Sequence, residues 1–197
     1  SSATTTVVAE STTVEYPEKP AWHFDQEDGL VPAERKTWSQ WRGYELVRVR
    51  KGDASGQQSM TDTRYFRGMD GDKLTTGTKR VDITDSRNGK WRDSDPLTGT
   101  EREEVTYDKS GGVVMSRSLT DPWMSAATAT RNASWGTTYA FQLGEHRSRQ
   151  GQLLSDGTWR ETGSDNTYDD RGVLQKSLDL NDVGVPGDDQ CTTYDYA

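Results

Sequence analysis

Short runs of alternating apolar and polar residues, separated by turn-forming residues, follow one another along most of the chain. In residues 43–51, Val47 and Val49 fall on one side of an extended chain and Leu46 falls on the other. A period of two residues is typical of a β-strand. Further strands are expected at residues 60–67, 79–84, 101–107, 113–119, 127–135, 137–143, 158–168 and 173–178.

Residues with a strong turn preference lie between these runs. Asn88-Gly89 and Asp156-Gly157 supply the positive φ angles that type I′ hairpin turns require. No stretch keeps an apolar period of 3.6 residues for more than about two turns, so helices are not expected. The sequence therefore predicts an all-β domain, built as an antiparallel meander of long hairpins.

The first 20 residues differ from the rest, because Ser and Thr are abundant there and the segment ends with two prolines. Residues 1–20 can form a strand or a linker, with candidate strands at 4–8 and 12–16, and pairing with the body is the favoured interpretation. Residues 21–197 are expected to form one antiparallel β domain. Its first part, residues 21–40, shows no steady period and is expected to be rich in loops.

Aliphatic residues are too few for an ordinary core. Leu, Ile, Val and Phe account for 28 of the 197 residues, which is below the share of about 20% under which disorder becomes the usual expectation. The chain nevertheless has 7 Trp, 8 Tyr and 25 Thr, residues that suit a pleated, half-buried surface. We therefore expect a folded sheet with a thin core in which aromatic side chains supply much of the buried area.

The formal net charge of −8 restricts the possible partners. Nucleic acids and anionic membranes attract basic surfaces, so no binding to nucleic acid is expected. No run of about 18 apolar residues occurs, so no membrane insertion is expected either. Asp70-Gly71-Asp72 and Asp93-Ser94-Asp95 are similar to fragments of calcium loops, but the complete pattern is absent and ordinary turn chemistry is the favoured interpretation.

Few residues are available for catalysis. The chain has one cysteine, Cys191, and two histidines, His23 and His146, so neither a nucleophile–histidine–acid triad nor a zinc site is indicated. A hydrolase with a pair of carboxylates stays open as an alternative, although no acid has a recognisable context. We therefore assign no catalytic, cofactor-binding or metal-binding residue and expect a protein that is not an enzyme.

One turn sequence occurs twice. Residues 106–113 and 167–173 both read Thr-Tyr-Asp-x-x-Gly, followed closely by Val, and each leads into a run that contains Ser-Leu and then Asp. In the expected geometry, the Tyr ends a strand and lays its ring on the sheet. The Asp accepts backbone N–H groups of the turn, the Gly takes a positive φ, and the next strand returns antiparallel.

The repeated turn, the strand after it and the acidic loop resemble the YD repeats of RHS proteins, teneurins and the BC components of Tc toxins. The segment from Trp41 to Val47 resembles the one that precedes the shell in Tc-toxin B components. The resemblance covers residues 38–197. The two copies lie 61 residues apart (168 − 107), whereas the family's repeats are closer together, and Tyr194-Asp195 is a truncated third. The segment is therefore interpreted as a degenerate or opening part of a shell.

In that family, long hairpins spiral into a hollow β-shell, which implies a curved sheet or part of such a shell here. The resemblance implies a non-enzymatic scaffold segment of a large secreted or surface-located bacterial protein. Its implied partners are other segments of the same RHS shell or an enclosed effector domain such as a toxin. It implies no cofactor and no catalytic residue.

The main alternative is a carbohydrate-binding or adhesive secreted β module, with a glycan as partner. Stacking on aromatic rings would carry this function, and a core role is the favoured interpretation of the tryptophans because aliphatic residues are scarce. Exposed aromatic side chains along one face would instead favour sugar binding. The seven candidates are Trp22, Trp38, Trp41, Trp91, Trp123, Trp135 and Trp159.

Overall fold

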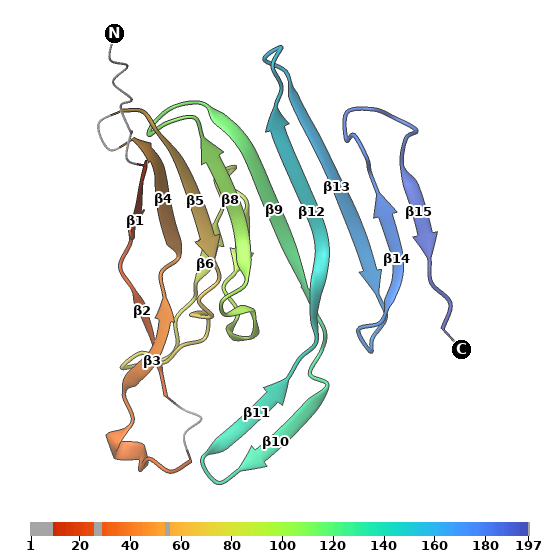
Figure 1. The fold of residues 1–197 in the computed structure, drawn as a ribbon. Helices are drawn as coiled ribbons and strands as arrows, with labels where there is room; N and C mark the ends of the chain where they lie inside the picture. Colours follow the sequence, from red (N-terminus) through yellow and green to blue (C-terminus); the bar gives the residue numbers. More distant parts are fainter. Residues whose placement is uncertain (1–9, 26–28, 54–55, 197) are drawn as a thin grey trace.

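A nine-stranded antiparallel sheet forms the body of the protein, seen in a computed structural model that describes residues 10–25, 29–53 and 56–196. The strands lie side by side in the order in which they occur in the chain (Figure 1). The fold is therefore all-β, as the sequence predicts. The sheet consists of β1 (Glu10–Glu15), β4 (Leu46–Asp53), β5 (Gln58–Tyr65), β8 (Glu101–Tyr107), β9 (Val114–Met124), β12 (Leu143–Leu153), β13 (Trp159–Tyr168), β14 (Leu174–Asp179) and β15 (Gln190–Thr193).

Three excursions leave the sheet between neighbouring strands. The first holds β2 (Ala21–Phe24), the short 3-10 helix η1 (Ala33–Arg35) and β3 (Trp38–Gly43). The second, called the 66–100 insertion below, holds β6 (Asp82–Thr84), β7 (Lys90–Arg92) and the 3-10 helix η2 (Asp95–Leu97). The third is the β10–β11 arm, a hairpin of β10 (Ala129–Ala133) and β11 (Gly136–Ala140) that extends beyond the main sheet on the side of β2 and β3 (Figure 1).

The N-terminal part of the chain is more regular than its sequence indicates. β1 pairs with β4 along its whole length, from Glu10 opposite Asp53 to Glu15 opposite Arg48. The candidate strand at residues 4–8 lies outside the described residues. Residues 21–40 are not only loop, because β2 pairs there with β3, and Trp22 lies opposite Trp41.

β12 is the longest element that the sequence pattern misses. It runs for 11 residues and pairs with β9 on one side and with β13 on the other. Its sequence, LGEHRSRQGQL, is polar on both faces. An alternation of apolar and polar residues arises only where one face of a strand is buried. The missing alternation therefore indicates a strand of a single-layered sheet.

The apolar core lies beside the sheet, in the 66–100 insertion. Phe66, Ile83 and Leu97 are at most 2% exposed, and Trp91 packs against them. The prediction that the tryptophans lie in the core is therefore wrong for most of them. Trp22, Trp38, Trp41 and Trp159 are 37–51% exposed, and among the described core residues Trp91 alone represents this residue type.

Candidate functional site

The three residues considered for catalysis lie on strands that do not pair with one another. His23 is buried in β2, His146 is exposed at an irregular position of β12, and Cys191 is exposed in β15. The Nδ1 atom of His146 lies 3.1 Å from the carbonyl oxygen of Asn166. The structure does not bring these side chains together, and the features that remain are the sheet, its turns and its edges.

The turn between β13 and β14 has the geometry expected of the repeat. Asp169 Oδ1 accepts hydrogen bonds from the backbone N–H groups of Arg171 (2.9 Å) and Val173 (2.8 Å). Gly172 has a φ of +81°. The hydrogen bonds, that from Val173 foremost, hold the pKa of the Asp169 carboxyl below its ordinary value. The aspartate therefore fixes the turn from which the next strand returns.

The turn between β8 and β9 uses the same chemistry with one more residue. Asp108 Oδ1 accepts the N–H of Val113 at 2.7 Å, and Gly111 has a φ of +69°. Four residues separate Asp108 from Val113, because Gly112 is added. A shift of register flanks the turn in both copies, beside Tyr107 and beside Tyr168.

A third copy of this turn lies at Asp85 in the 66–100 insertion, where the sequence comparison missed it. Asp85 Oδ1 accepts the N–H groups of Arg87 (3.0 Å) and Gly89 (2.8 Å), as Asp169 does in its turn. Asn88 replaces the glycine and has a φ of +65°, which asparagine tolerates better than most residues. The turn therefore has three residues and one positive φ, and the expected two-residue type I′ turn is wrong here.

Tyr168 shows what the tyrosine of the repeat does. Its ring stacks on Trp123 of β9, with centroids 4.6 Å apart. Its hydroxyl donates to the carbonyl oxygen of Glu145 at 2.9 Å, where β12 has an irregular register. The ring also covers Gly144, where an added Cβ would lie 2.8 Å from it. This side chain thus holds β9, β12 and β13 together on one face of the sheet.

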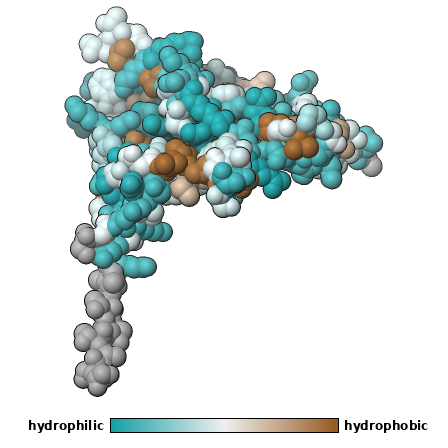
Figure 2. All heavy atoms as spheres, turned by 90° about the horizontal axis from the view of Figure 1, so that it is seen from above, coloured by the Kyte–Doolittle hydropathy of each residue, from teal (hydrophilic) through white to brown (hydrophobic). Residues whose placement is uncertain are grey.

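One face of the sheet carries rows of small polar side chains. Glu104, Ser118, Gln150 and Thr162 lie opposite one another on β8, β9, β12 and β13. They line an open groove of about 530 Å³ together with the next row, which includes Ser116. Hydrophilic residues likewise dominate the view of the molecule in Figure 2, where hydrophobic patches are small and scattered. This surface is called the open face below. It is a shallow groove and not a deep pocket of the kind that most active sites occupy.

The opposite face carries charged residues under the 66–100 insertion. Glu103 of β8 is 1% exposed. It accepts hydrogen bonds from Ser86, from N–H at 2.9 Å and from Oγ at 2.5 Å. The Nε atoms of Arg64 and Arg117 lie 3.6 and 3.4 Å from its carboxylate. Glu103 therefore links β5, β8 and β9 to the insertion.

Arg102, the residue before Glu103, forms a second buried link at a point where the register between β5 and β8 shifts. Its guanidinium donates to Asp85 at 2.8 Å and also pairs with Asp121 of β9. Its Cζ atom lies 5.3 Å from the centroid of the Trp91 ring, within the range of a cation–π contact. The third copy of the repeated turn is thus anchored to the sheet by charge.

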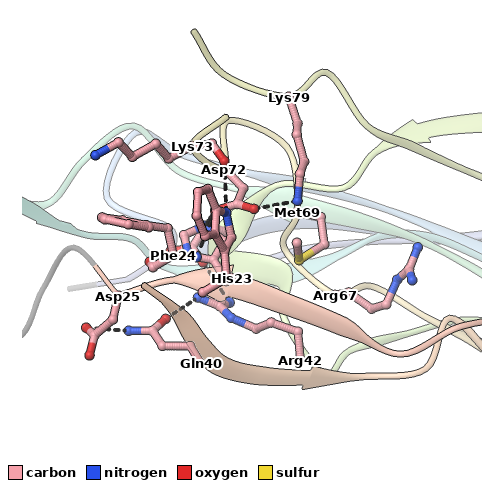
Figure 3. A network of polar contacts seen from close by, with 12 residues as sticks. His23, Phe24, Asp25, Gln40, Arg42, Arg67, Met69, Asp72, Lys73 and Lys79 are labelled. Carbon is pink, nitrogen blue, oxygen red and sulfur yellow. Dashed lines mark hydrogen bonds and ion pairs between the residues drawn. The ribbon is translucent and has the colours of Figure 1, made fainter. Parts of the chain in front are cut away.

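Asp72, a residue of the 66–100 insertion, links this insertion to β2 (Figure 3). Its side chain is fully buried and accepts hydrogen bonds from Phe24 N–H at 2.8 Å and from Lys79 Nζ at 2.6 Å. His23 Nε2 lies 3.7 Å from Asp72 Oδ1, while Nδ1 lies 2.8 Å from the carbonyl oxygen of Phe24. Burial alone raises the pKa of Asp72, but the Lys79 and Phe24 contacts outweigh it, so the net pKa lies below the ordinary 3.8.

Replacing Asp72 with Asn is expected to lower the free energy of unfolding at neutral pH by about 1.5–3 kcal/mol, because hydrogen bonds to a charged acceptor are lost. A carboxyl whose pKa is lower in the folded than in the unfolded state stabilises the fold at pH values above its pKa in the unfolded state. The contribution is lost as pH falls from about 3.8 through the lower folded pKa. Urea unfolding of the wild type and Asp72→Asn across this pH range checks the difference, with exposed Asp170→Asn as the control.

The acidic segments that are similar to calcium loops are occupied by backbone donors. Asp93 is 2% exposed and accepts the N–H groups of Arg67, Gly68 and Met69 at 2.8–3.1 Å. Asp70 accepts the N–H of Val81. Within residues 10–25, 29–53 and 56–196, no three His, Cys, Asp or Glu side chains are grouped so that they could hold a metal ion.

Exposed aromatic side chains gather at the junction of β1, β3 and β4. Tyr16 stacks on Tyr44 with centroids 4.1 Å apart, and Trp41 contacts both Tyr44 and Trp22. The rings at the two Trp41 contacts are inclined by 81° and 68°. Such rings do not form the flat platform on which several sugar rings could stack in line.

No family model and no curated protein matches the chain. Among solved structures, the crystal structure of TcdB2-TccC3-TEV, from a Tc toxin, is similar with a TM-score of 0.51 and 14% sequence identity. The match covers 86% of this chain and 9% of that one, so the chain spans a small part of its neighbour. At this identity the likeness concerns the fold alone.

Proposed function

We propose that this chain is a structural wall segment of a larger RHS-type shell or display scaffold, and that it acts without catalysis. Its partners would be neighbouring segments of the same shell or an effector domain such as a toxin. The proposed location is outside the cell or at its surface. Among the described residues, no helix is long and apolar enough to cross a membrane.

The open sheet carries this proposal. Each inner strand pairs with the strand before it and the strand after it, and within the described residues the sheet stops at β1 and β15, which each pair there with one strand. A sheet with two unpaired edges can continue through further strands at either end. The likeness to the Tc toxin structure and the three copies of the Asp-based turn support the same role.

The register identifies the donors on the outer edge of β15. Tyr194 N–H donates to Gln175 of β14 at 3.0 Å. Because the N–H groups of an antiparallel strand alternate in direction, Thr192 also faces β14, whereas Cys191 and Thr193 face outward. A proline at position 191 would remove an outward donor and leave the pairing with β14 in place.

The isolated chain is therefore expected to self-associate through its edges as its concentration rises. Light scattering after size-exclusion chromatography under reducing conditions measures the association, and hydrogen exchange locates the amides that become protected. Cys191→Pro should reduce association, whereas Cys191→Ser, which removes the thiol alone, should not. A chain that stays monomeric at high concentration, with no protection gained in β1 or β15, would contradict the proposal.

A further inference from the structure

A groove of about 350 Å³ runs between the β10–β11 arm and the body of the protein. One wall is formed by Asp95 and Pro96 of η2, and the other by the arm. The arm contributes Trp135, Gly136, Thr137, Thr138, Tyr139 and Phe141.

The residues of the arm wall show that the groove follows a strand edge. Four consecutive residues of β11, 136–139, line it, whereas side chains on one face of a strand would alternate. None of the residues that line the groove belongs to β10. In the described part of the chain, β11 pairs with β10 alone, so the groove lies on the side of β11 that has no neighbouring strand.

We propose that this groove binds an extended peptide, which adds to the free edge of β11 as a third strand. An unpaired strand edge offers N–H and C=O groups that such a peptide can satisfy, and adjacent pockets select its alternate side chains. Asp95 and Pro96 stand where they would enclose the added strand.

The walls define the chemistry of that peptide. Tyr139 is 58% exposed, its ring lies 6.4 Å from that of Phe141, and both line the groove with Trp135. Aromatic walls favour apolar side chains at the alternate positions that face them. The net charge of −8 disfavours an acidic peptide, while the half-exposed Asp95 carboxylate is already paired with Arg42 at 2.7 Å. The occupant is therefore an extended segment with alternating β-branched residues and a neutral or positive charge.

The full chain can be titrated with a fluorescein-labelled peptide, acetyl-Lys-Val-Thr-Val-Lys-Val-amide, with anisotropy as the readout. Two analogues carry N-methyl groups on the odd or on the even residues. Addition to a strand edge predicts that one analogue loses affinity by about tenfold or more while the other loses much less, because only one set of N–H groups faces β11. Absence of saturable binding, or equal affinity of both analogues and the parent peptide, overturns the proposal.

Tyr139→Ser should weaken binding of the parent peptide several-fold, since it removes one aromatic wall. Tyr196→Ser is the matched control, because Tyr196 is 60% exposed at the end of the sheet and should leave binding unchanged. If both variants bind the peptide equally, or if the groove binds cello-oligosaccharides in a Tyr139-dependent way and no peptide, the proposal is wrong. The peptide analogues test it on the unmodified chain, so it does not depend on the folding of a variant.

Discussion

Replacing Glu103 with Ala is expected to lower the free energy of unfolding by about 3 kcal/mol. The change removes a carboxylate that is 1% exposed and leaves Arg64 and Arg117 without their shared partner. It also frees both donors of Ser86. The lower end of the usual range for broken buried ion pairs applies, because the two arginine side chains are 23% and 16% exposed.

The neighbouring residue supplies a matched control. Glu104 has the same side chain on the same strand, but it is exposed on the open face, so Glu104→Ala should change the free energy of unfolding by less than about 0.5 kcal/mol. Urea unfolding followed by circular dichroism compares the two variants at neutral pH. Equal stability of both would show that the Glu103 network does not hold the insertion on the sheet.

Replacing Phe66 with Ala is expected to cost about 3–5 kcal/mol. Phe66 is 1% exposed in contact with Ile83 and Leu97, and these three residues form the buried apolar cluster of the 66–100 insertion. A cavity in so small a core has few neighbours that could collapse into it. Phe66→Leu keeps most of the volume and should cost less than about 1.5 kcal/mol.

Hydrogen exchange distinguishes a local from a global effect of Phe66→Ala. The amides of the 66–100 insertion should lose protection first, because the cluster around Phe66 lies there. Unchanged protection of this insertion, together with a loss of stability below about 1 kcal/mol, would contradict the expected role of Phe66.

Several strands of the main sheet could be predicted from the sequence. β4, β5, β8 and β14 follow alternating runs, and their turns contain the expected Gly, Asn and Asp residues. β12 could not be found in this way, because its two faces are both polar and no burial imposes a period. The pairing of β2 with β3 was missed for another reason, because both strands are short and their register shifts at two places, so no steady period appears.

The buried charges could not be predicted because their partners are distant in sequence. Asp72 and Phe24 are 48 residues apart, and Glu103 and Ser86 are 17 apart. The third Asp-based turn was hidden because Ile83, Thr84 and Asn88 stand where the other two copies have Thr, Tyr and Gly. A search that keeps only the Asp and accepts asparagine for the glycine would have found Asp85 23 residues before Asp108 (108 − 85).

The order of the strands also determines how the sheet can form. Every main strand pairs with its predecessor in the chain, so each pairing requires only the segment just completed. Contacts between segments close in sequence lower the entropic cost of closing the loops between them, and they speed folding. A chain that emerges gradually from a ribosome or a translocation channel can therefore extend its sheet hairpin by hairpin, with the growing edge as template for the next strand.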